Sequence, residues 1–129
     1  MNPGRWNTAG VPLVYAAESR SLASLEMLVH AEDTRLLAAI RWAAIPVEIE
    51  DSLIHVPATL PDNWWRTPPM NSIRKLGVAW VEEARTPVMR VPSAVTRGEF
   101  NYLLNPRHPD IARLKIGTAT RFAFDSRAL

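Results

Sequence analysis

The stretch that decides the fold runs from Gly4 to His30 and reads GRWNTAGVPLVYAAESRSLASLEMLVH. Its turn-forming residues up to Gly10 predict a loop. The apolar run at 11–16 predicts a short strand. Ser19 is a favourable N-cap for a helix that continues to about His30. This stretch therefore presents one arginine on a loop, one tyrosine on a strand and one glutamate on a helix.

These three side chains, Arg5, Tyr15 and Glu26, are the candidate functional residues of the stretch. Arg5 is either a solvated loop residue or a phosphate ligand. Tyr15 is either a core residue or a ring that stacks on a flat ligand. Glu26 lies beside the apolar stripe of Leu22, Leu25 and Val29, where a purely structural carboxylate is unusual, and His30 is placed to contact it.

The remaining chain predicts one further long helix and several late strands. The helix is capped by Asn71 or Ser72, shows an apolar face from Ile73 to Ala84, and is ended by Pro87. Strands are expected at 45–49, 53–56, 88–91 and 102–104, and alternation predicts more around 114–116 and 122–124. Segment 32–41 is ambiguous between a loop and a short helical turn. Two main helices with most strands gathered late indicate an α+β fold.

Composition narrows the class of protein. A chain of 129 residues with 47% apolar residues fits one globular domain. Cysteine is absent, and no segment resembles a membrane span or a signal peptide, so we expect a soluble, cytoplasmic protein without membrane association. The net charge is only +2 and the arginines are scattered, which argues against direct nucleic-acid binding.

Several common chemistries lack their motifs. The five glycines are isolated, so neither a Rossmann fingerprint nor a P-loop is present. The histidines at 30, 55 and 108 have no ligand spacing, and we expect no metal site. Ser93 follows a predicted strand but lies in no Gly-x-Ser-x-Gly elbow; on its own it reads as an ordinary turn serine.

Taken in order, however, many short motifs resemble those of the RES domain. They are Gly4-Arg5-Trp6-Asn7, Val14-Tyr15, Glu18-Ser19, Leu25-Glu26-Met27-Leu28-Val29-His30, Leu60-Pro61, Trp64, Gly77, Trp80, Val91-Pro92-Ser93-Ala94, Asn101-Tyr102-Leu103-Leu104-Asn105-Pro106, His108-Pro109, Phe122, Phe124-Asp125 and Arg127. The arginine, glutamate and serine that give this family its name fall on Arg5, Glu26 and Ser93. The resemblance extends from Gly4 almost to Leu129.

The resemblance implies a fold, a reaction and a partner. RES proteins are toxins of bacterial toxin–antitoxin pairs, with Xre-type antitoxins as partners, and commonly form homodimers. Their fold is similar to that of ADP-ribosyltransferases, with a mostly antiparallel split sheet. They act on NAD+ as substrate and need no other cofactor. Some members hydrolyse or phosphorolyse NAD+, and others ADP-ribosylate a protein.

The same resemblance assigns roles to residues. Glu26 would stabilise the cationic ribose as nicotinamide leaves, and Arg5 would pair with the pyrophosphate or ribose of NAD+. Tyr15 would stack on the nicotinamide, and Ser93 would bind the nicotinamide–ribose region, in a catalytic and substrate-binding role. RES domains usually carry a further strand and arginine upstream of the Gly-Arg-Trp-Asn motif. We therefore expect residues 1–129 to form a single RES domain without that segment, and a weakly active domain that chiefly binds its antitoxin is an alternative.

Overall fold

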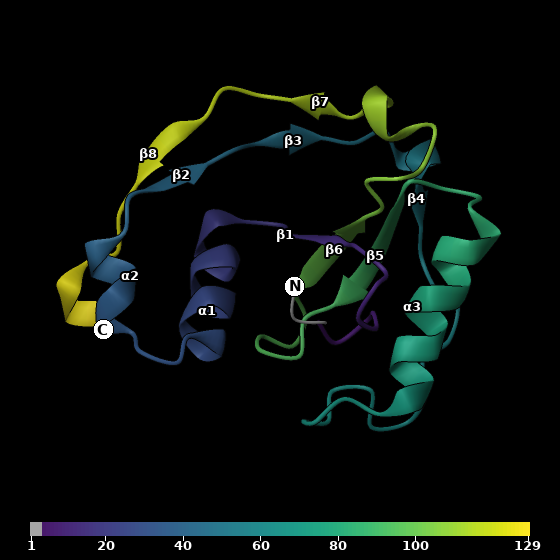
Figure 1. Ribbon diagram of the computed structural model, residues 1–129, viewed down its shortest axis with the longest axis horizontal. Coiled ribbons are helices and arrows are strands. Elements are labelled where there is room, and N and C mark those ends of the chain that lie inside the picture. Colours follow the sequence, from purple (N-terminus) through teal and green to yellow (C-terminus); the bar gives the residue numbers. More distant parts are fainter. Residues whose placement is uncertain (1–3) are drawn as a thin grey trace.

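The computed structural model describes residues 4–129 and is built around a four-stranded sheet (Figure 1). The strand order is β1-β6-β5-β4, where β1 is Val14–Ala17, β6 is Phe100–Leu104, β5 is Val88–Pro92 and β4 is Ile54–His55. The pairs β1–β6 and β6–β5 are antiparallel, and β4–β5 is parallel. Strand β6, near the end of the chain, thus lies between the first strand and β5.

Three helices accompany this sheet: α1 (Arg20–His30), α2 (Arg35–Ala39) and α3 (Asn71–Glu83). Short 3-10 turns occur at Asp51–Leu53, Ile111–Arg113 and Ser126–Ala128. The combination of helices with mostly antiparallel pairing confirms the predicted α+β class. None of the helices within residues 4–129 is long and apolar enough to cross a membrane.

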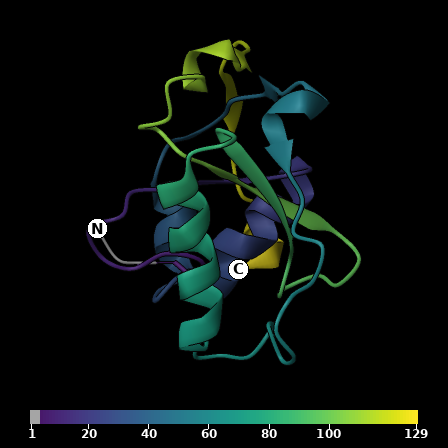
Figure 2. The same ribbon diagram turned by 90° about the vertical axis from the view of Figure 1, so that its right-hand side faces the viewer.

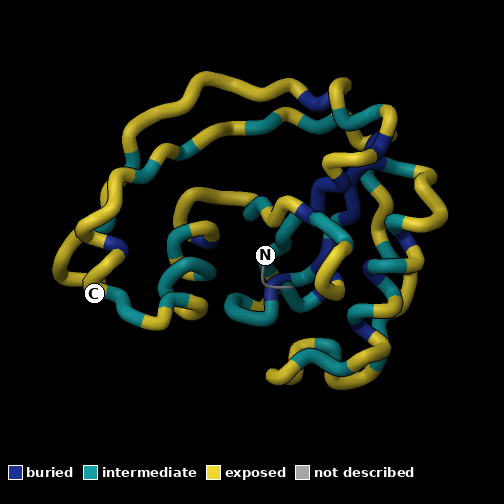
Figure 3. The backbone as a smooth tube through the Cα atoms, in the orientation of Figure 1, coloured by how far each residue is buried: buried dark blue, intermediate teal, exposed yellow. Residues whose placement is uncertain are grey.

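The core fills the space between α3 and one face of the sheet (Figures 2 and 3). Alternate residues of β5 and β6 point to this face, as the period of two requires. The buried cluster consists of Trp6, Leu13, Ile73, Trp80, Met89, Val91 and Leu103. A smaller cluster on the opposite face consists of Leu53, Val88, Leu104 and Leu114. Each face of the sheet therefore packs against its own cluster of apolar side chains.

Two short two-stranded sheets form an arch over the second face of the four-stranded sheet (Figure 1). One of these sheets pairs β2 (Trp42–Ala44) with β8 (Thr120–Phe122), and the other pairs β3 (Val47–Glu48) with β7 (Lys115–Ile116). Strand β2 is a feature that the sequence patterns did not predict. Its three residues lack a clear alternation, and its existence depends on pairing with a segment some 80 residues away.

The ends of α3 differ from the prediction. Met70, and not Asn71 or Ser72, is the N-cap residue, and its side chain makes no capping hydrogen bond. The helix ends at Glu83 because Ala84 takes the left-handed conformation, several residues before Pro87. The exposed peptide group of Ala84 is secured by buried His108, whose ring lies 2.7 Å from the Ala84 carbonyl oxygen.

Helix α1 begins as predicted, since the Ser19 hydroxyl accepts a hydrogen bond from the Leu22 backbone N–H at 3.1 Å. The predicted apolar stripe is only partly buried, however. Leu22 is 2% exposed, whereas Leu25 and Val29 are 40% and 56% exposed. The helix is therefore turned so that Glu26, rather than Leu25, lies toward the sheet.

Candidate active site

The site is centred on Glu26, whose carboxylate reaches from α1 to the sheet. Its Oε1 atom accepts a hydrogen bond of 2.9 Å from the Ser93 hydroxyl. The same atom accepts a second bond of 2.8 Å from Nδ2 of Asn101. Ser93 directly follows β5, and Asn101 lies in β6. Three elements that are distant in the sequence therefore converge on one carboxylate oxygen.

Ser93 is fully buried, and its hydroxyl is completely engaged within the protein. It accepts hydrogen bonds from the backbone N–H groups of Val95, at 3.1 Å, and Thr96, at 3.0 Å. A serine hydroxyl has one proton to donate and two lone pairs. Because both lone pairs are occupied, the proton is directed to Glu26. Ser93 therefore does more than an ordinary turn serine, because it also binds the carboxylate of Glu26.

The second oxygen of Glu26 is more open. Oε2 lies 3.5 Å from Nε2 of His30, one helical turn further along α1, so the predicted contact between the two residues is confirmed. The side chain of His30 is 68% exposed, and that of Glu26 is 21% exposed. A ligand can therefore approach Oε2 while Oε1 is held by the protein.

Tyr15 is fixed by its hydroxyl and open at its ring. The hydroxyl donates to Oδ1 of Asn7 and accepts from the backbone N–H of Trp6 at 3.2 Å. Partial burial raises the pKa of Tyr15, and this is opposed by the Trp6 hydrogen bond and by the charges of Arg5 and Arg74. The residue remains 42% exposed, which leaves room for a flat ligand.

Arg5 holds a second loop in place. Its Nη1 donates to the carbonyl oxygens of Trp64, at 3.3 Å, and Arg66, at 2.6 Å, while Nη2 donates to the Thr67 hydroxyl at 3.1 Å. A guanidinium has five N–H donors, so the Nε–H and one Nη2–H are left without a partner among residues 4–129. Burial lowers the pKa of Arg5, and the negative charge of Glu26 partly offsets this.

Two glycines permit the close packing of this region. A side chain at Gly4 would collide with the ring and hydroxyl of Tyr15. A side chain at Gly77 would collide with the backbone carbonyl of Trp6, because α3 lies directly against the loop there. Trp6 itself is 3% exposed and anchors the loop in the core. The loop that carries Arg5 is thus held on both sides.

The structure therefore brings Glu26 and Ser93 into direct contact and places Arg5 and Tyr15 close enough to affect each other's pKa. Two further residues, Asn101 and Asn7, were missed by the sequence reasoning. Asn7 is 3% exposed and accepts from the Gly4 backbone N–H at 2.9 Å. Both asparagines occur inside recognised motifs, but only the fold shows which atoms they contact.

The arrangement places an anchored carboxylate, Glu26, near the guanidinium of Arg5, which in turn lies near the ring of Tyr15. A carboxylate with one anchored and one accessible oxygen can stabilise a developing positive charge. Within residues 4–129, no group of three His, Asp or Glu side chains is placed to hold a metal ion. The residues present are suited to binding a ligand that carries both anionic and flat cationic parts.

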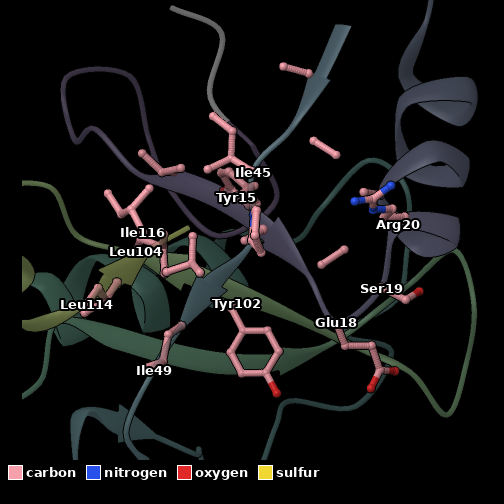
Figure 4. Close-up of a pocket in the computed structure, with 18 of the residues that line it drawn as sticks. Tyr15, Glu18, Ser19, Arg20, Ile45, Ile49, Tyr102, Leu104, Leu114 and Ile116 are labelled. Atoms are coloured by element: carbon pink, nitrogen blue, oxygen red, sulfur yellow. The ribbon is translucent and has the colours of Figure 1, made fainter. Parts of the chain in front are cut away.

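A hollow of about 1040 Å³ lies under the arch, and Tyr15 of the candidate site is among its lining residues (Figure 4). Aliphatic side chains such as Ile45, Leu104 and Ile116 line it, with Tyr102 and Glu18 toward one end. It involves the second face of the sheet and does not include Glu26, Ser93 or Asn101 among its lining residues.

The fold and site define an α+β domain with a carboxylate-centred ligand site, and sequence comparisons give its family. The profile of the RES domain matches residues 1–125. "Prs ADP-ribosylating toxin" of Sphingobium sp. is 34% identical, over 98% of this chain and 80% of the relative. Proteins named "Toxin Res" from Yersinia enterocolitica and Photorhabdus laumondii are 36% and 38% identical, each over 96% of this chain and at least 80% of their own length. The chain belongs to the RES domain family.

Proposed function

We propose that this protein is the toxin of a bacterial toxin–antitoxin pair and that it depletes NAD+ by cleaving the bond between nicotinamide and ribose. The observation that carries the proposal is the carboxylate of Glu26, anchored through Oε1 by Ser93 and Asn101 and open at Oε2. Its membership of the RES domain family, whose relatives are named as toxins, supports the biological role.

Glu26 would act on the transition state of bond cleavage. Loss of nicotinamide leaves an oxocarbenium-like ribose, as in glycoside hydrolysis. A carboxylate held in place before the reaction stabilises that cation without having to reorganise. Partial burial strengthens the interaction, because less water screens it. Oε2 is the oxygen that would face the ribose.

Arg5 and Tyr15 would hold the rest of the substrate. The N–H groups of Arg5 that have no partner within residues 4–129 suit a pyrophosphate oxygen or a ribose hydroxyl. The open ring of Tyr15 would stack on nicotinamide, which is positively charged until it leaves. The hydrogen-bonding groups of Ser93 are all used within the protein, so its predicted direct bond to substrate requires rearrangement, and its contribution is better exerted through Glu26.

The acceptor of ADP-ribose defines a second candidate. Water or inorganic phosphate would make the protein an NAD+ glycohydrolase or phosphorylase. Transfer to a protein would make it an ADP-ribosyltransferase, and the name of the Sphingobium relative, "Prs ADP-ribosylating toxin", favours this alternative. Both reactions begin with the same bond cleavage, so the role of Glu26 is common to them.

A toxin of this class also needs a neutralising partner. We propose an antitoxin protein of the Xre type as the partner and a homodimer as the assembly. Co-expression followed by size-exclusion chromatography with light scattering measures both states. A monomer that forms no complex with the Xre-type product of a neighbouring gene would contradict this part of the proposal.

The reaction itself is tested by incubating the purified protein with NAD+ and separating the products by chromatography. The proposal predicts free nicotinamide in excess of the protein concentration. ADP-ribose indicates hydrolysis, its 1''-phosphate indicates phosphorolysis, and added mass on a protein indicates transfer. Absence of nicotinamide release with water, phosphate and a cell extract as acceptors would overturn it.

A further inference from the structure

The second donor to Glu26, Asn101, occupies a rigid position in the fold. It lies in β6, the strand that is hydrogen-bonded to β1 on one side and to β5 on the other. In the register of the sheet it stands opposite Ala17 and Val91. Its backbone is therefore fixed from both sides, and its side chain lies on the same face as that of Leu103, two residues on.

The two donors to Glu26 come from different strands but meet on one atom. Asn101 Nδ2 is 2.8 Å from Oε1 and Ser93 Oγ is 2.9 Å from it. Rotation of the carboxylate about its last bond would break both hydrogen bonds together. Two backbone N–H groups also fix the direction of the Ser93 proton. Ser93 and Asn101 therefore hold the Oε1 atom of Glu26 in a defined position before a substrate binds.

Holding Oε1 determines where Oε2 lies. Within residues 4–129, Oε2 lies 3.5 Å from the exposed ring of His30 and accepts no hydrogen bond from a strand, whereas both strand donors go to Oε1. We propose that Asn101 is a positioning residue, which acts with Ser93 to hold the Glu26 carboxylate so that Oε2 is presented to the substrate. This inference rests on the proposed function. It assigns to Asn101 a part in the reaction and not merely in fixing α1 to the sheet.

The two interpretations of Asn101 predict different kinetics. A bond that only attaches α1 to the sheet would affect stability and substrate binding alike. A bond that orients a reacting group affects the transition state most, because small displacements of a catalytic group cost about 100-fold in rate. The positioning role therefore lowers kcat and leaves the KM for NAD+ nearly unchanged.

The test is the steady-state rate of nicotinamide release by Asn101→Asp, which keeps the size of the side chain and replaces the donor by an oxygen. We expect kcat to fall by about 100-fold, with KM within about threefold of wild type. Asn101→Ala, which removes the donor without adding charge, should lower kcat by at least about tenfold and serves where the aspartate variant does not fold. Asn71→Asp, on the exposed start of α3, adds the same charge and should leave kcat unchanged.

A double-mutant cycle separates action through Glu26 from an independent effect. In a Glu26→Gln background, Asn101→Ala should change the residual rate by less than about twofold, because the group that it positions has already been altered. Full additivity of the two losses would overturn the positioning role. So would an active wild type whose folded Asn101→Asp and Asn101→Ala variants keep the wild-type kcat, while the proposed function would stand. A wild type that releases no nicotinamide would overturn both.

Discussion

The hydroxyl of Ser93 donates a 2.9 Å hydrogen bond to Oε1 of Glu26, although 67 residues separate the two in the sequence. This bond joins α1 to the end of β5 at the centre of the candidate site. It also explains why a serine is buried there, since the hydroxyl satisfies two backbone N–H groups as well as the carboxylate.

Replacement of that serine tests the network. Ser93→Ala leaves the backbone N–H groups of Val95 and Thr96 without their acceptor and removes one donor from Glu26. We expect the free energy of unfolding to fall by about 2 kcal/mol, the typical cost of buried polar groups that lose their partner. Urea unfolding followed by circular dichroism measures this. Ser72→Ala, at an exposed position, is the control, and equal stability of the two variants would contradict the network.

We expect NAD+ binding to require the planar, forked set of N–H donors of the Arg5 guanidinium. A lysine cannot contact the Trp64 and Arg66 carbonyls, the Thr67 hydroxyl and a ligand at once. Arg5→Lys should therefore raise the KM for NAD+ by about tenfold or more, which corresponds to loss of one charge-assisted contact. Arg107→Lys, on an exposed loop, should leave KM unchanged. An unaltered KM in the Arg5 variant would remove Arg5 from the binding site.

Close packing at Gly77 leads to a stability prediction. An added Cβ would overlap the Trp6 carbonyl, which is backbone and cannot move aside alone. Overpacking of this kind costs about 1–3 kcal/mol, more than the roughly 1 kcal/mol that alanine gains over glycine as a helix former. Gly77→Ala should therefore lower the melting temperature. Lys75→Ala, on the exposed side of the same helix, should not, and a melting temperature of Gly77→Ala at or above wild type would contradict the observed packing.

The raised pKa of Tyr15 predicts that the protein loses stability at alkaline pH. Its pKa is raised in the folded protein above the ordinary value of 10.0, chiefly by burial. The folded state therefore retains the phenolic proton more strongly than the unfolded state. The stabilisation that follows from this raised pKa of Tyr15 is fully present below about pH 10 and is lost as pH rises through the pKa of the folded state. Urea unfolding between about pH 8 and pH 11 should show a smaller alkaline decline for Tyr15→Phe than for wild type. Identical declines would contradict the assignment.

The sequence predicted the framework better than the contacts. The Ser19 cap and the period of α1 located that helix, and the apolar face of α3 located the second, because both signals are local. The apolar stripe predicted for α1 is buried only at Leu22, since Leu25 and Val29 remain exposed. Which side of a helix is covered depends on the strands brought beneath it, and here those strands include the distant β6.

The same limit applies to the site. Family resemblance pointed to Arg5, Tyr15, Glu26 and Ser93, but no spacing rule connects a helix glutamate with an asparagine 75 positions later. Asn101 became visible only when β6 was paired between β1 and β5. Likewise, the alternative of Tyr15 as a core residue is wrong, because the residue is 42% exposed and is held at its hydroxyl by Asn7 and the Trp6 backbone.

The most direct measurement is the rate of nicotinamide release from NAD+ by wild type and by Glu26→Gln, with folding of both verified by circular dichroism. The glutamine keeps the shape of the side chain and removes its charge, so we expect the rate to fall by at least about 100-fold while the fold is retained. Glu82→Gln, on the exposed side of α3, should match wild type. An active wild type and an equally active Glu26→Gln variant would contradict the central role of this carboxylate.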